Sequence, residues 1–198
     1  RWIMFRTTVF ERNSEGYHTF RIPSVICTTQ GTLLAFAEGR SSRKDATEND
    51  IVLKRSENCG RTWGDLTVIV SAGKDSLNNP QPVVVSETGR TYVMYQRTPY
   101  PCHERDISEG IEGDKVSHTY LIHSDDEGKT WSDPKKITSS VKRPQIATST
   151  AAGPGIGIEI KHGNYAGRLV MPFNQGPWGK WRDYAVYSDD QGKTWQYG

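Results

Sequence analysis

Short hydrophobic runs, each ended by Gly, Asn, Asp or Pro, follow one another along the chain, and none has the 3.6-residue period of a helix. The runs have the length and composition of β-strands. The predicted strands cover residues 20–27, 32–37, 50–55 and 67–70, then 81–85, 90–96 and 118–124 with one strand after them, and finally 157–161, 168–172 and 183–188. The pattern therefore predicts an all-β fold made of three successive four-stranded antiparallel units.

An eight-residue pattern, S-x-[DN]-x-G-x-T-W, follows the third predicted strand of each unit. The copies begin at Ser56, Ser124 and Ser188, which lie 68 and then 64 residues apart. We call these copies the first, second and third box. The Asp or Asn side chain can bond backbone amides of a tight turn, and the Gly can supply the positive φ that the turn needs. The Trp that ends each box begins the next strand and is expected to cover the core. A fixed period of this size predicts stacked repeats.

Repeated four-stranded units are typical of β-propellers, which close with about four to eight such blades. Three units leave two open faces that need neighbours. We therefore expect residues 1–198 to be the N-terminal half of one propeller domain, with blades at roughly 17–75, 76–145 and 146–198. The expected partner is the C-terminal half of the same propeller, and the alternative is a three-unit domain that dimerises.

Composition excludes several classes of function. The formal net charge is +2, and the basic segment 135–143 has no interleaved aromatic residues, so nucleic-acid binding is not expected. No run approaches the ~20 apolar residues of a membrane-spanning helix. Cys27, Cys59 and Cys102 form no CxxC pair, so neither a metal site nor a disulfide framework is predicted. Cys27 lies in an apolar strand and is expected to be buried.

A second group of motifs precedes the first box. Phe20-Arg21-Ile22-Pro23 opens the first unit, and Ala35-Phe-Ala-Glu-Gly-Arg40 is followed five residues later by Asp45. Together with the boxes, these motifs resemble the exo-α-sialidase (neuraminidase) family over essentially the whole chain. The resemblance implies a six-bladed propeller that hydrolyses terminal α-linked sialic acid from glycans or glycoconjugates with retention. It implies no metal and no organic cofactor.

By this resemblance, Arg21 is one of three arginines that clamp the sialic acid carboxylate. Guanidinium groups suit this task because they form paired, charge-assisted hydrogen bonds with carboxylates. Pro23 fixes the backbone just after Arg21, as expected near a strand end. The alternative for Arg21 is a surface arginine in an ordinary ion pair.

Asp45 is implied to be the general acid and base, which protonates the leaving glycosidic oxygen and then activates water. Glu48 and Asp50 are rival acids in the same loop, and a solvated loop carboxylate is the alternative for Asp45. Arg40 is implied to contact the O4 side of the sugar. Its alternative is a structural ion pair with Glu38 or with Asp45 itself.

Asn79, which precedes Pro80 at the start of the second unit, resembles a position that contacts the N-acyl group of the sugar. Asn is also common in simple turns before proline, and the two readings stay open. The long loop 98–116 is expected to border the pocket, without a role that the residues identify.

Sialidases use a Tyr nucleophile, an exception among glycosidases. The resemblance implies that this Tyr, the Glu that activates it and two clamp arginines lie beyond the third box, so the isolated chain is expected to lack its nucleophile. Tyr184 and Tyr187 lie in the strand before the third box and are interpreted as packing residues.

Two other functions remain open at this stage. One is a catalytically inactive, lectin-like propeller that binds sialic acid, and the other is a non-enzymatic propeller such as a sorting-receptor domain. Within the enzyme class, the substrate could carry a related ulosonic acid, or the sugar could be transferred instead of hydrolysed. Arg1 opens the chain without Met, so we expect that upstream residues have been removed. The substrate class favours a secreted, periplasmic or lysosomal-type location.

Overall fold

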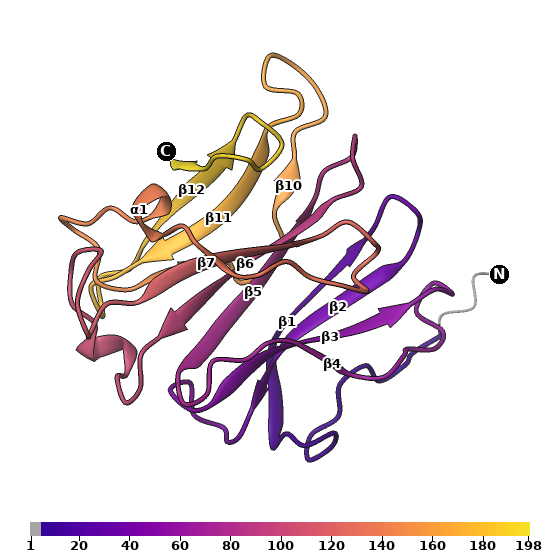
Figure 1. The fold of residues 1–198 in the computed structure, drawn as a ribbon, viewed down its shortest axis with the longest axis horizontal. Coiled ribbons are helices and arrows are strands. Elements are labelled where there is room, and N and C mark those ends of the chain that lie inside the picture. Colours follow the sequence, from indigo (N-terminus) through magenta and orange to yellow (C-terminus); the bar gives the residue numbers. More distant parts are fainter. Residues whose placement is uncertain (1–4) are drawn as a thin grey trace.

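The computed structural model describes residues 5–198, and it is built almost entirely from antiparallel strands (Figure 1). The first unit contains β1 (Thr19–Cys27), β2 (Leu33–Arg40), β3 (Asn49–Ser56) and β4 (Thr67–Val70). The second contains β5 (Ser76–Val84), β6 (Thr91–Thr98), β7 (His118–Ser124) and β8 (Lys135–Lys136). The third contains β9 (Thr150–Ala152), β10 (Ile158–Glu159), β11 (Leu169–Gln175), β12 (Arg182–Ser188) and β13 (Gln196–Tyr197). The helical elements are a 3₁₀ turn, η1 (Glu104–Asp106), and one turn of α-helix, α1 (Thr138–Val141).

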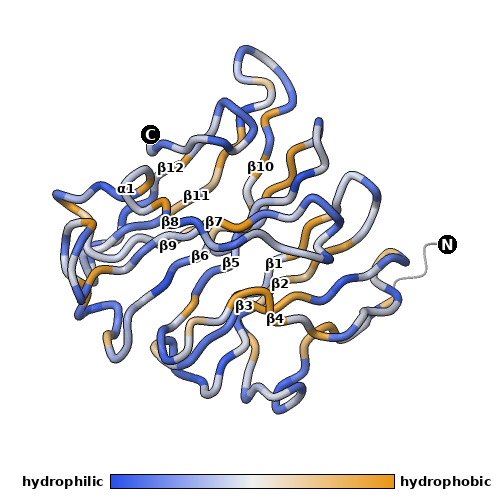
Figure 2. Tube along the Cα trace, in the orientation of Figure 1, coloured by the Kyte–Doolittle hydropathy of each residue, from blue (hydrophilic) through white to orange (hydrophobic). Residues whose placement is uncertain are grey.

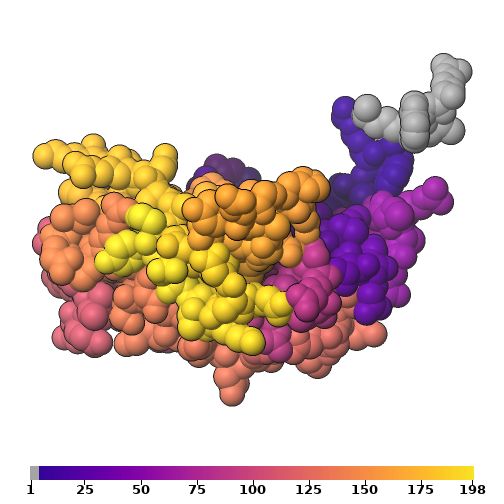
Figure 3. Space-filling model, turned by 90° about the horizontal axis from the view of Figure 1, so that it is seen from above, coloured from indigo at the N-terminus to yellow at the C-terminus, as the bar shows by residue number. Residues whose placement is uncertain are grey.

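The strands of the first two units pair in chain order as a meander, and in the third unit β9 and β10 both pair with β11 before β12 and β13 follow in order. A single parallel bridge between Asn49 and Ser76 joins the first two units into one sheet. The first strands pack beside one another, since β1 contacts β5, and β5 contacts β9 and β10. In the space-filling view, the first unit and the end of the third lie on opposite sides of the molecule (Figure 3).

The first strand of every unit is interrupted at a residue with positive φ that precedes a proline. Ile22 has φ 52° and Asn79 has φ 55°, each at a bulge in the pairing with the second strand. In the third unit Gly153, with φ 66°, ends the pairing of β9, and β10 resumes it on β11. The strand predicted at 157–161 is therefore only the later part of a split first strand. A bulge bends its strand and changes the direction of the side chains beside it. The interruptions therefore direct the residues that precede them toward the same end of the units.

The turns of the boxes fold as predicted, with one addition. The prediction that the Trp of each box begins the next strand is wrong, because those strands begin later, at Thr67, Lys135 and Gln196. In the second box Asp126 Oδ1 accepts from the Thr130 amide at 2.9 Å, and Ser124 Oγ accepts from the Gly128 amide at 2.9 Å. The other two boxes repeat both bonds. Positive φ is required at two consecutive residues, not only at the Gly: Glu127 has φ 63° and Gly128 has φ 77°.

Each later box packs on the unit before it. A Cβ on Gly128 would collide with Leu34 of the first unit, and one on Gly192 would collide with the ring of Tyr92 in the second. The box tryptophans follow the same rule, because Trp131 meets Phe36 edge-on at 5.8 Å, and Trp195 meets Tyr92 at 6.1 Å. The two hydrophobic cores accordingly lie between the first and second units and between the second and third.

The predicted all-β class is confirmed, and hydrophobic residues concentrate on the strands while the loops are mostly hydrophilic (Figure 2). The prediction that Cys27 is buried is wrong. Strand β1 alternates strictly after its bulge, so Ser24 and Ile26 face inward while Val25 and Cys27 are exposed. None of the helices in the described part of the chain has the length and apolar character to cross a membrane.

We predict that Asp126→Ala lowers the free energy of unfolding by about 2 kcal/mol, because it removes several hydrogen bonds to a charged acceptor. Burial alone would raise the pKa of Asp126, but hydrogen bonds from Thr130 and Ser124 outweigh burial and lower this pKa from 3.8 to about 2. The stabilisation is therefore complete above the ordinary carboxyl pKa and is lost as the pH falls toward 2.

Chemical unfolding of the wild type, of Asp126→Ala and of Asp65→Ala, which alters an exposed loop carboxylate, measures this effect. The difference between wild type and Asp126→Ala should shrink between about pH 4 and pH 2. A difference that does not change with pH, or that Asp65→Ala reproduces, would contradict the role given to the box carboxylate.

Candidate active site

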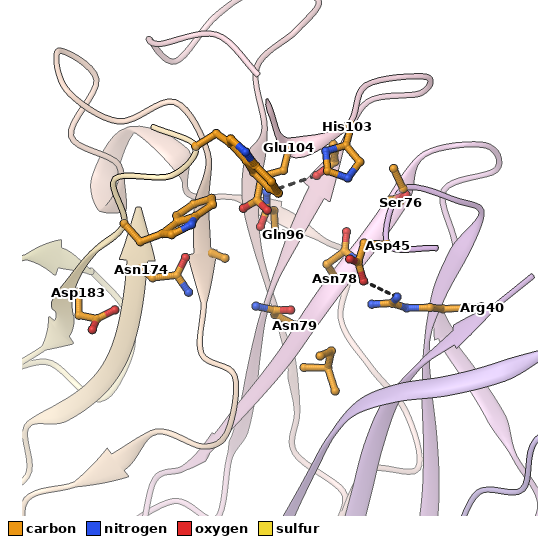
Figure 4. Close-up of a pocket in the computed structure, with 16 residues that line it drawn as sticks. Arg40, Asp45, Ser76, Asn78, Asn79, Gln96, His103, Glu104, Asn174 and Asp183 are labelled. Carbon is orange, nitrogen blue, oxygen red and sulfur yellow. Dashed lines mark hydrogen bonds and ion pairs between the residues drawn. The ribbon is translucent and has the colours of Figure 1, made fainter. Parts of the chain in front are cut away.

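A pocket of about 520 Å³ opens where the interrupted strands of the three units meet, and the Asp45–Arg40 pair lies on one side of it (Figure 4). Asn174 and Asp183 lie on the other side, with Asn79 between (Figure 4). Its wall combines charged, amide and aromatic side chains. The lining residues are Ile22, Arg40, Asp45, Ala46, Ser76, Asn78, Asn79, Gln96, Thr98, His103, Glu104, Ala151, Asn174, Trp178, Trp181 and Asp183.

Three of the residues that the sequence singled out form one charged cluster. A guanidinium nitrogen of Arg40 donates to Asp45 Oδ1 at 2.6 Å, and a nitrogen of Arg21 donates to the same oxygen at 3.2 Å. The side chains of Arg21 and Asp45 are 48% and 67% exposed, whereas that of Arg40 is 2% exposed. The cluster therefore has a buried member, Arg40, and two members that solvent or a ligand can reach.

Glu38 holds this cluster in place through its contacts with Arg40. Its side chain is fully buried, and one carboxylate oxygen, Oε2, accepts from Arg40 Nε at 2.6 Å and also pairs with Arg40 Nη2. The other, Oε1, accepts the backbone N–H of Asn79 at 2.7 Å. Burial raises the pKa of Glu38, and the Arg40 charge and the Asn79 amide oppose that rise. Glu38 thus connects the second strand of the first unit with the bulge of the second unit.

The bulges bring these groups together. Arg21 pairs with Glu38 in the register of β1 and β2, and the bulge that follows is tied to the next one because Ser24 Oγ donates to Pro80 O at 2.9 Å. Asn79 lies in that next bulge with φ 55° and also lines the pocket. Both sequence-based readings of Asn79, the turn before proline and a place at the pocket, are therefore compatible with its position.

The loop between β2 and β3 presents one acid to the pocket. Asn49 Nδ2 donates to the backbone O of Asp45 at 2.9 Å, which holds the loop against the start of β3. Of the rival acids, Asp50 accepts the hydroxyl of Tyr17 at 2.7 Å, and neither Glu48 nor Asp50 lines the pocket. The geometry therefore favours Asp45 as the acid of this loop that can meet a ligand.

Arg40 forms the ion pairs named as its structural alternative, with both Glu38 and Asp45. Arg21 does not itself line the pocket and reaches it through Asp45.

The long loop after β6 borders the pocket, as predicted, through Thr98, His103 and Glu104, although the sequence did not select these residues. Sequence reasoning missed Trp178 and Trp181, which come from the loop between β11 and β12. The Trp178 ring meets His103 at 5.4 Å and Trp181 at 5.8 Å, edge to face in both cases. Burial raises the pKa of Glu104, and the nearby negative charge of Asp45 adds to this rise. These loops have no periodic signal from which such positions could be found.

One missed set does have a signal in the sequence. Glu38, Gln96 and Asn174 each lie five residues after the residue that pairs with the box serine of their unit. All three are at or beneath the pocket. Aligning the three units on their boxes would have identified this polar position.

Tyr184 has the packing role that the sequence predicted. Its ring packs on Phe173 with centroids 5.7 Å apart, and its hydroxyl donates to Val141 O at 2.7 Å. No tyrosine lines the pocket within residues 5–198. The same part of the chain has no cluster of three or more His, Cys, Asp or Glu side chains arranged to hold a metal ion.

Comparison with known proteins identifies a family and several curated relatives to which this chain is similar. The family described as a BNR repeat-like domain matches residues 31–198. A curated sialidase of Micromonospora viridifaciens is 34% identical over 93% of this chain and 29% of its own length. Sialidase-3 of Bos taurus is 30% identical over 98% of this chain and 48% of its own length. The chain therefore spans about half, or less, of the curated relatives it matches.

Solved structures agree in fold. The Hadza microbial sialidase Hz136 superposes with a TM-score of 0.83 at 28% identity, over 92% of this chain and 37% of that one. A leech intramolecular trans-sialidase superposes with a TM-score of 0.86 over 98% of this chain and 46% of its own. Its 17% identity supports similarity of fold alone.

We predict that Glu38→Gln lowers the free energy of unfolding by about 3 kcal/mol, because it leaves the buried Arg40 guanidinium without its main counter-charge. The double variant Glu38→Gln/Arg40→Met should recover part of this loss, since it removes the unpaired charge and keeps an acceptor for the Asn79 amide. Urea unfolding measures both. A double variant less stable than Glu38→Gln would show that the pair does not stabilise the fold in this way.

Proposed function

The chain belongs to the BNR repeat-like domain family, and from this premise we propose that it is part of an exo-α-sialidase that removes terminal α-linked sialic acid from glycoconjugates. The resemblance to sialidases stated from the sequence motifs is confirmed by the curated relatives. The observation that carries the proposed activity is an exposed acid at the pocket, Asp45, that pairs with the guanidinium groups of Arg40 in the pocket wall and of Arg21 beside it.

In the proposed mechanism, Arg21 binds the substrate carboxylate through charge-assisted hydrogen bonds. Asp45 gives its proton to the glycosidic oxygen as the bond from the anomeric carbon to that oxygen breaks, and later removes a proton from the attacking water. A Tyr outside this chain forms the intermediate bond to the anomeric carbon, so the two displacements retain the configuration. We further propose that Arg40 and Asn79 contact the sugar at O4 and at the N-acyl group.

A catalytically inactive sialic-acid lectin is the less favoured alternative, because the curated relatives are named as sialidases. Hydrolysis and sugar transfer share the same first step, and the products formed with and without an acceptor glycan distinguish them. We propose no metal and no organic cofactor for either reaction.

We also propose that these three units are blades of a six-bladed propeller, at roughly 17–75, 76–145 and 146–198, completed by a C-terminal half. The first box supports this. Trp131 and Trp195 each donate their indole N–H to the Gly carbonyl of their own box and pack on the preceding unit. In the first box, a Cβ on Gly60 would meet only Leu33 and Trp63 of its own unit, whereas Gly128 and Gly192 pack on the preceding unit. A further unit packed against the first box would supply the corresponding neighbour for Trp63.

We predict that, in the complete protein, Trp63→Ala and Trp195→Ala each lower the free energy of unfolding by about 3–5 kcal/mol, as deletion of a buried aromatic side chain does. Trp195 is the matched control, because it has the same box position and a packed neighbour. Thermal or urea unfolding measures both variants. A loss of about 1 kcal/mol or less for Trp63→Ala alone would count against a unit packed on the first box.

We predict that Asp45→Ala lowers kcat of the complete protein by about 10²–10⁴-fold, the usual contribution of general acid–base catalysis. The loss should be larger for a natural sialoside than for a fluorogenic aryl α-sialoside, because the aryl alcohol needs less protonation as it leaves. Arg21→Ala should mainly lower kcat/KM for both substrates. Steady-state kinetics measure these values.

The matched control is Asp65→Ala, which removes an exposed loop carboxylate away from the pocket and should leave the kinetics unchanged. If the complete protein binds sialic acid but releases none, the lectin function replaces the proposed one. If Asp45→Ala retains wild-type kcat on both substrates, another residue is the acid.

A further inference from the structure

Arg21 already has a carboxylate partner beside the pocket, that of Asp45. The contact is an ion pair of 3.2 Å between an Arg21 guanidinium nitrogen and Asp45 Oδ1. In the proposed function the same guanidinium must hold the carboxylate of the substrate. One cation therefore faces two carboxylates, one from the protein and one from the ligand.

The two arginines that hold Asp45 differ in how firmly they are fixed. The Arg40 side chain is 2% exposed, and Glu38 and the backbone O of Lys44 accept its other hydrogen bonds. The Arg21 side chain is 48% exposed, and its contact with Asp45 is longer, 3.2 Å against 2.6 Å. Arg21 can therefore exchange its partner at lower cost than Arg40 can.

Both arginines contact the same oxygen of Asp45, Oδ1. Losing Arg21 thus leaves Asp45 attached through Arg40 by that oxygen. The second oxygen, Oδ2, accepts no hydrogen bond from residues 5–198. In the proposed mechanism it is therefore the oxygen that carries and transfers the proton while Oδ1 stays on Arg40.

We propose that Asp45 is an internal stand-in for the substrate carboxylate on Arg21, and that ligand binding displaces it while Arg40, fixed by Glu38, retains it beside the pocket. Arg40 then positions Asp45, in addition to its proposed contact with the sugar at O4. Binding of the carboxylate and release of the acid become one event, since the group that leaves Arg21 is the group that transfers the proton.

This inference rests on the proposed function and has a consequence that a simple binding role for Asp45 does not share. Removing the Asp45 charge removes a competitor for Arg21, so a variant that has lost catalysis should bind a carboxylate ligand more tightly. Exposed ion pairs are worth about 0.2–1 kcal/mol. The expected gain in affinity is therefore about 1.4- to fivefold.

The test measures, by calorimetry, the affinity of the complete protein for 2,3-didehydro-2-deoxy-N-acetylneuraminic acid, an unreactive carboxylate-bearing analogue. Asp45→Asn keeps the size of the side chain and removes its charge. Asp183→Asn is the matched control, because Asp183 also lines the pocket and is not part of the Arg21–Asp45–Arg40 cluster. Arg21→Ala and Arg21→Ala/Asp45→Asn complete a double-mutant cycle.

We expect tighter binding by Asp45→Asn, no comparable gain in Asp183→Asn, and no gain from Asp45→Asn in the Arg21→Ala background. Equal or weaker binding by Asp45→Asn would overturn the inference and leave the proposed function standing. An equal gain in Asp183→Asn would assign the effect to the general negative charge of the pocket and would also overturn it. A gain in affinity from Asp45→Asn that persists in the Arg21→Ala background would overturn the inference as well. A wild-type protein that does not bind the analogue would overturn the proposed function as well.

Discussion

The buried ion pair between Glu38 and Arg40 is the interaction on which the rest of the site depends. It lies at the pocket end of β2 and reaches both the bulge of the second unit, through the Asn79 amide, and the acid loop, through Asp45. A charged pair in the interior is costly unless its remaining hydrogen-bonding capacity is used, and here each partner makes such contacts. The pair therefore fixes the position of Asp45 relative to two different units.

The periodic part of this structure was predictable from the sequence. Strand positions and box turns follow from alternation and from Gly and Asp or Asn at fixed places, because backbone geometry limits which residues can stand there. Cys27 shows the limit of this reasoning. Composition marked its strand as apolar, but the bulge at Ile22 decides which face points inward, and that register depends on pairing with β2.

The candidate site was predictable only in part, for a related reason. Arg21, Arg40, Asp45 and Asn79 follow or lie within short motifs beside strand ends, so the sequence could select them, although their roles remain proposals. The rest of the pocket wall comes from two loops. The loop 98–116 was expected at the pocket, but Glu104 could not be selected within it, and Trp178 and Trp181 of the second loop have no periodic neighbours. Their convergence results from how the units pack, a long-range property that no local pattern encodes.

The residue before each box glycine has the same backbone conformation, with positive φ, but its residue type differs from box to box. In the second box this residue is Glu127, whose carboxylate accepts from Thr28, and in the third it is Gln191, which donates to Glu87 at 2.5 Å. The turn has the same backbone in each box, but this one side chain forms a different hydrogen bond with the preceding unit. If the units were placed in another order, these specific hydrogen bonds would be lost, so the contacts favour the native order of the repeats.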